Sequence, residues 1–204
     1  MYRPPFENVQ NASKEELPKI IRSLKIRLYK LKRIMEHPFY ESTVCPDELT
    51  IYKCDKKLLS EAIVRYTVLG GEYKPSRCEL RDIKFSEKLE DIKRIIFRRF
   101  AYFGVNEESI VDLSGEKAVF GCYAGGEFIG IHGEDKDEFL QEFANLHVGE
   151  WRKSYLPDRF GVCVLDGVEW ELKIEYNTHK SVKFSGTNAY PYNFKELLRV
   201  INAE

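Results

Sequence analysis

The chain has 204 residues, of which 43% are hydrophobic and 13% aromatic, and its formal net charge at pH 7 is −1. This length suits one large domain, or one domain with a helical appendage, and the composition excludes an intrinsically disordered chain. The near-neutral charge excludes a partner chosen by net charge alone.

The first predicted element is a helix over residues 17–35. Its apolar residues are spaced 4, 3, 4, 3 and 4 positions apart, which is typical of a helix that packs along another helix. These residues are Leu17, Ile21, Leu24, Leu28, Leu31 and Met35. Pro38 should end this helix.

Two further helices are predicted before the middle of the chain. One covers 56–69, with Asp55 as its N-cap and Gly70-Gly71 at its end. The segment 72–85 is interpreted as a connection and contains the domain boundary. The other helix covers 87–103, with Ser86 as its N-cap.

The period of the pattern then changes from helix to strand. Residues 117–123 and 127–132 are predicted as paired strands, and 136–146 as a short helix capped by Asp135. Residues 161–185 are predicted as an antiparallel β-meander whose first turn is Asp166-Gly167. That turn would pair Cys163 with Trp170 on the buried face. A last helix should begin after Asn193, its predicted N-cap.

These elements predict an α+β fold. N-terminal helices precede an antiparallel sheet of about five strands, with helices on one face and a C-terminal helix. We expect an N-terminal helical region at 1–74 and an α+β domain at 75–204 that contains the meander.

The segment from Leu165 to Leu198 carries a motif, DG-x-x-W-x-L-x-I-x-Y followed by G-x-N-A-Y-P-x-N-F-x-x-L. It resembles a module of uncharacterised proteins from Firmicutes and their mobile elements. The matching positions are Asp166, Gly167, Trp170, Leu172, Ile174, Tyr176, Gly186, Asn188, Ala189, Tyr190, Pro191, Asn193, Phe194 and Leu197. The resemblance implies a bacterial source and a shared fold element. It implies no activity.

The cysteines and the N-terminus indicate a cellular location. The five cysteines are an odd number without a C-x-x-C pair, which argues against a disulfide framework. No apolar signal segment opens the chain, and no apolar run approaches the ~20 residues of a membrane span. We therefore expect reduced thiols, a cytoplasmic protein and no membrane association.

Standard catalytic and metal motifs are missing from the sequence. Glu127 stands where a P-loop requires lysine, and no zinc-ligand spacing joins the four histidines. Cys163 is expected to be buried and inert, whereas Cys122 has His132 on the neighbouring predicted strand, in a register that the sequence does not fix. We predict no cofactor, no catalytic residue and no local metal motif, while a metal site assembled from distant segments stays open.

The first candidate site is the basic helix 17–35, which has no acidic residue. Its candidate partner-binding residues are Arg22, Lys25, Arg27, Lys30, Lys32 and Arg33. Such a face could bind a protein or a nucleic acid. The alternatives are a solvated face, or pairing with the acidic stretch 127–150 within the chain or across a dimer.

The second candidate site lies between the loops 147–160 and 186–193, which flank the meander. Its candidate ligand-binding residues are His147, Glu150, Trp151, Tyr155, Asn188 and Tyr190. Aromatic walls with a few polar groups suit a small ligand or a peptide. The alternative is structural, with these residues packing and capping.

Three functions therefore compete. The preferred one is a non-enzymatic binding or accessory module that recognises a macromolecular partner through helix 17–35. The first alternative is an enzyme for a small substrate at the two loops. The second is a homo-oligomeric structural protein, for example a homodimer, joined through the apolar seam of that helix.

Overall fold

The computed structural model describes residues 9–42, 44–101, 106–124, 127–164 and 167–203. The chain divides into two compact units, Met1–Pro75 and Ser76–Glu204. The boundary predicted from the sequence lies between residues 74 and 75. In the described part, no helix combines the length and the apolar character that crossing a bilayer requires.

The first unit is a pair of helices, α1 (Leu17–Met35) and α2 (Glu48–Val68), preceded by a short 3-10 turn, η1 (Val9–Asn11). The predicted seam packs along α2 and is buried at Leu17, Ile21, Leu24, Leu28 and Met35. The seam is therefore covered within one chain.

The second helix is longer than the predicted 56–69, and its N-cap is not Asp55. The Asp47 side chain accepts a hydrogen bond from the Thr50 amide at 2.9 Å and so caps the helix. Asp55 lies within α2 rather than at its start. Its side chain is fully buried and pairs with Arg27 at 2.8 Å. A carboxylate in this position stabilises the packing of α1 on α2.

The second unit contains a seven-stranded sheet in the order β4-β3-β2-β1-β6-β7-β5. Its strands are β1 (Ile92–Ala101), β2 (Glu107–Asp112), β3 (Lys117–Ala124), β4 (Glu127–Asp135), β5 (Ser154–Tyr155), β6 (Val168–Tyr176) and β7 (Val182–Thr187). The α+β class is confirmed, but the expected five strands are seven. The sheet is also mixed, because β5 runs parallel to β7.

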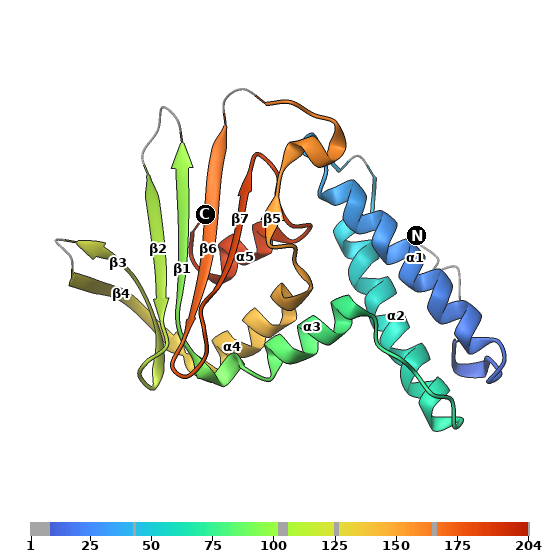
Figure 1. Cartoon of the computed structure of the whole chain (residues 1–204). Helices are drawn as coiled ribbons and strands as arrows, with labels where there is room; N and C mark the ends of the chain where they lie inside the picture. Colours follow the sequence, from blue (N-terminus) through green and yellow to red (C-terminus); the bar gives the residue numbers. More distant parts are fainter. Residues whose placement is uncertain (1–8, 43, 102–105, 125–126, 165–166, 204) are drawn as a thin grey trace. The chain divides into compact units, whose positions relative to one another are not determined.

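Helices cover one face of this sheet (Figure 1). They are α3 (Arg77–Ser86), α4 (Lys136–Asn145) and α5 (Phe194–Val200). Three 3-10 turns belong to the same unit: η2 (Leu89–Asp91) before β1, η3 (Val148–Glu150) after α4, and η4 (Pro157–Phe160) after β5. The core lies between these helices and the sheet, and includes Phe97, Phe143, Leu172 and Leu197. Asp135 caps α4 through the Glu138 amide, as predicted.

The predicted helix 87–103 is wrong, because β1 occupies most of that range. Ile92, Ile96 and Phe100 have helical spacing, but Ile95 and Phe97 join Ile92 in the core while Phe100 is exposed. Long-range pairing with β2 and β6 decides the conformation. β-branched side chains also favour a strand.

The predicted connection 72–85 is likewise wrong over most of its length, where α3 forms. Ser76 accepts a hydrogen bond from the Glu79 amide, and Glu79 accepts one from the Ser76 amide at 2.6 Å. This capping box fixes the start of α3, and its Ser-x-x-Glu spacing is visible in the sequence.

The second hairpin of the meander is confirmed and the first is not. β6 pairs with β7 antiparallel, with Leu172 opposite Phe184 and Ile174 opposite Val182. The partner that flanks β6 on its other side is β1, not the segment before it. Cys163 is consequently exposed and does not pair with Trp170. The Asp166 turn lies outside the described residues.

Candidate functional site

Four of the six loop candidates pack into the second unit. Trp151 and Tyr155 are buried, and Trp151 Nε1 donates a hydrogen bond to Asn193 Oδ1 at 3.0 Å. Asn188 Oδ1 accepts from the Val168 amide at 2.9 Å, and Tyr190 stacks on Trp170. Their positions agree with the structural alternative at these four residues.

Asn193 is not the side-chain cap that the sequence predicts for α5. Its amide nitrogen donates to the Leu146 carbonyl at 2.7 Å while its oxygen accepts from Trp151. The side chain therefore ties the end of α4 to the segment that follows η3.

A pocket of about 210 Å³ lies in the second unit, where α3 meets the segment 149–153 and the ends of β6 and β7. Its apolar lining consists of Phe85, Trp151, Tyr176, Val182 and Phe184. Burial, and to a lesser extent the charge of Asp91, raise the pKa of Tyr176 to about 12. Its hydroxyl is thus neutral at physiological pH, and the floor of the pocket carries no charge.

The remaining side chains around this pocket are basic. They are Arg81, Lys84 and Lys88, from α3 and the turn after it, and Lys153. We call this arrangement the basic–aromatic pocket. Arg81, Lys84 and Lys88 are three or four positions apart, so α3 and its end direct them to one side.

The ammonium group of Lys153 lies beside an aromatic ring and near another base. Its Nζ lies 4.4 Å from the centre of the Phe184 ring. Desolvation lowers the pKa of Lys153, and the nearby Arg81 lowers it further. Within the described residues, no ion pair joins a carboxylate to any of the four bases of the pocket.

On the face of the sheet that the helices leave open, basic side chains form ion pairs with carboxylates. Arg94 pairs with Asp112 at 2.6 Å, Arg98 pairs with Glu108, and Lys183 lies 3.3 Å from Glu171. Charges there are matched across neighbouring strands. The bases of the pocket therefore differ from the ion-paired bases on the open face of the sheet.

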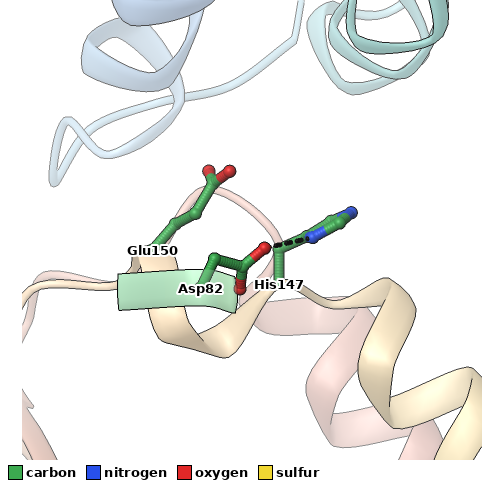
Figure 2. A group of neighbouring side chains, drawn as sticks. All are labelled: Asp82, His147 and Glu150. Carbon is green, nitrogen blue, oxygen red and sulfur yellow. Dashed lines mark hydrogen bonds and ion pairs between the residues drawn. The ribbon is translucent and has the colours of Figure 1, made fainter. Parts of the chain in front are cut away.

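His147 and Glu150, the other two loop candidates, come together with Asp82 of α3 (Figure 2). One donor atom from each of the three lies within 4.8 Å of the others, and all three residues are half-buried. His147 Nδ1 and Asp82 Oδ2 are 2.6 Å apart. We call these three residues the histidine–carboxylate cluster.

The basic face of α1 is only partly free for a partner. Arg27 pairs with the buried Asp55, and the ammonium groups of Lys25 and Lys32 lie over the rings of Tyr73 and Tyr52. The other three candidates, Arg22, Lys30 and Arg33, are exposed. Half of the predicted set therefore stabilises the first unit.

Sequence reasoning missed the contribution of α3 to both arrangements. Asp82, Arg81 and Lys84 fell within the segment interpreted as a connection. The capping box at Ser76 could have identified the helix. Once α3 is recognised, the spacing of its bases follows from helix geometry.

No family model matches this chain, and neither the curated proteins nor the solved structures contain a significant match. The resemblance of the C-terminal segment to a bacterial module stays a prediction.

Proposed function

We propose that this chain is a non-enzymatic binding module that recognises an acidic segment of a partner protein through the basic–aromatic pocket. The observation that carries the proposal is the combination of four bases without ion-pair partners in the described structure and an uncharged aromatic floor. An acidic segment with one large apolar side chain has the matching chemistry. The apolar side chain would fill the pocket and the flanking carboxylates would pair with the bases.

The size of the pocket supports a peptide over a free metabolite. Its volume of about 210 Å³ is below the roughly 300–1,000 Å³ of sites for drug-sized ligands. A single anchoring side chain needs less room. Its binding energy would come from burial of the anchor, with the charges setting specificity and rate.

The arrangement of the bases supports a protein partner over a nucleic acid. They surround one cavity, whereas a bound phosphate backbone requires a groove or stripe of bases that follows it.

Fluorescence anisotropy with the full-length chain tests this proposal. The probe is a labelled acidic peptide with a central phenylalanine, and the comparison probes are the same peptide with alanine at the centre and a single-stranded oligonucleotide of equal charge. We expect the phenylalanine peptide to bind most tightly. Its affinity should fall as salt is added, because the charges are partly exposed.

Two charge reversals, Lys84→Glu and Lys153→Glu, should each weaken this binding at least tenfold. The matched control is Lys195→Glu, which makes the same change at an exposed position of α5 outside the pocket. Equal loss in all three variants would contradict the pocket as the site. Equal or tighter binding of the oligonucleotide would favour a nucleic-acid partner instead.

A further inference from the structure

We propose that Asp82, His147 and Glu150 bind a divalent transition-metal ion of the Zn²⁺ type. The inference is independent of the pocket and its partner. It begins from the convergence of one imidazole nitrogen and two carboxylates within 4.8 Å of one another. In Figure 2 the carboxyl group of Asp82 lies between the side chains of His147 and Glu150.

Two rigid elements hold these side chains together. Asp82 lies on α3, and η3 follows His147 and ends at Glu150. Val148 anchors η3 in the core with no exposed surface. A site on packed elements keeps its geometry better than one on a free loop.

The backbone at His147 and Gly149 is unusual in ways that serve this convergence. His147 adopts a left-handed conformation, with φ 50°, which is uncommon for a residue other than glycine. A Cβ atom at Gly149 would lie 2.6 Å from Asp82 Cα. The close approach of η3 to α3 is what places Glu150 beside Asp82.

The charge of the cluster favours a cation. Asp82 Oδ1 is buried and has no hydrogen-bond partner, and the side chain of Asp82 is only 13% exposed. Carboxylates in such a position are normally hydrogen-bonded, paired or bound to a metal. Glu150 adds a second carboxylate to the donor set.

The donor set selects the class of ion. Imidazole nitrogen suits zinc, nickel, copper and iron, whereas Mg²⁺ and Ca²⁺ prefer sites built from oxygen alone. Zinc lies about 2.0–2.2 Å from nitrogen and carboxylate ligands. Three protein ligands leave one position of a tetrahedral ion for water.

Binding requires a small change between His147 and Asp82. Their hydrogen-bonded atoms are 2.6 Å apart, and ligands of one zinc ion lie about 3 Å or more from each other. The ion takes the place of the hydrogen bond between the two atoms, and the neutral imidazole that ligates through Nδ1 carries its proton on Nε2. A rotation of either side chain supplies the extra separation.

The same unit contains a natural comparison for this site. His179 Nδ1 and Asp91 Oδ2 are also 2.6 Å apart, but His179 is more exposed. Among the described residues, no third ligand joins that pair. If a histidine–aspartate pair were sufficient, both places would bind zinc equally.

Calorimetric titration of the full-length chain with Zn²⁺ tests the proposal. We expect one site per chain, weakened at least tenfold by His147→Ala and by the near-isosteric Glu150→Gln. The control variant His179→Ala should bind as the wild type does. No binding by the wild type, or equal binding by the Glu150→Gln variant, would overturn the site.

Titration with Co²⁺ separates this site from binding by cysteine. Cys78 is the nearest thiol to consider, because its Sγ lies 3.4 Å from the Glu150 carbonyl oxygen. The proposed ligands predict visible cobalt bands without a thiolate charge-transfer band in the near ultraviolet. A strong thiolate band that disappears in Cys78→Ser would contradict the proposed ligands.

Discussion

Gly149 shows how one residue can control the approach of two elements. A Cβ there would lie 2.6 Å from Asp82 Cα and 2.7 Å from Phe85 Cβ, so α3 and η3 would have to separate. We expect Gly149→Ala to lower the free energy of unfolding by about 1–3 kcal/mol, the usual range for an overpacked core. Urea unfolding followed by tryptophan fluorescence measures this change.

The matched control for that prediction is Gly115→Ala. A Cβ at Gly115 would meet no atom within 4 Å. The control should change stability by no more than about 0.5 kcal/mol, as is usual at surface positions. Equal stability of the two variants would show that α3 and η3 do not pack as closely as described.

Single residues also show where a local pattern is insufficient. Asn193 has the residue type and position of an N-cap, yet its side chain bonds to Leu146 and Trp151. Its neighbour in space is 47 positions away in the chain. Capping rules describe contacts within one turn, so they cannot predict that a tertiary partner will compete for the same side chain.

At the scale of elements, the sequence predicts best where the apolar period is unambiguous. The seam of α1, the hairpin of β3 and β4, and the pairing of β6 with β7 all follow from local pattern. β1 does not, because its isoleucines and phenylalanines fit both a helix and a strand. Its two neighbouring strands supply the missing information.

The contact between α1 and α2 yields a test of a buried charge. Arg27 lies 2.8 Å from the fully buried Asp55, so Arg27→Met removes this positive charge from beside that carboxylate. We expect the helices of the first unit to lose up to about 3–5 kcal/mol of stability. Thermal unfolding followed by circular dichroism at the helix band measures the loss.

Arg22→Met is the comparison for this change, because Arg22 is an exposed base on the same helix. Its effect should stay within about 0.5 kcal/mol. If both substitutions have the same small effect, the Arg27–Asp55 pair does not stabilise the helix pair.

At the scale of the whole molecule, the candidate sites depend on segments that are distant in sequence. The sequence identified His147 and Glu150, but Asp82 stands 65 positions before His147. The pocket likewise joins α3 to residues at the ends of β6 and β7. Whether these distant segments meet depends on the order in which the strands and helices pack. That order cannot be predicted from the sequence when α3 is assigned as a connection and β1 as a helix.

The division of the chain into two units predicts that the second unit folds independently of the first. Every residue of the core cluster between the sheet and its helices lies between Phe85 and Ala203. Both tryptophans, Trp151 and Trp170, belong to this unit, so their fluorescence reports on it alone. A disruption confined to α1 should therefore be invisible to tryptophan fluorescence.

Leu24→Asp provides that disruption, because Leu24 is fully buried in the seam of α1. A charge there should reduce the helical circular dichroism signal, since a buried unpaired carboxylate is strongly unfavourable. The urea midpoint from tryptophan fluorescence should stay at the wild-type value, and a fragment of residues 76–204 should share it. Leu172→Asp, the same change in the core of the second unit, should abolish that transition. A lower midpoint in Leu24→Asp, or an unfolded fragment, would mean that the second unit needs the helices of the first in order to fold.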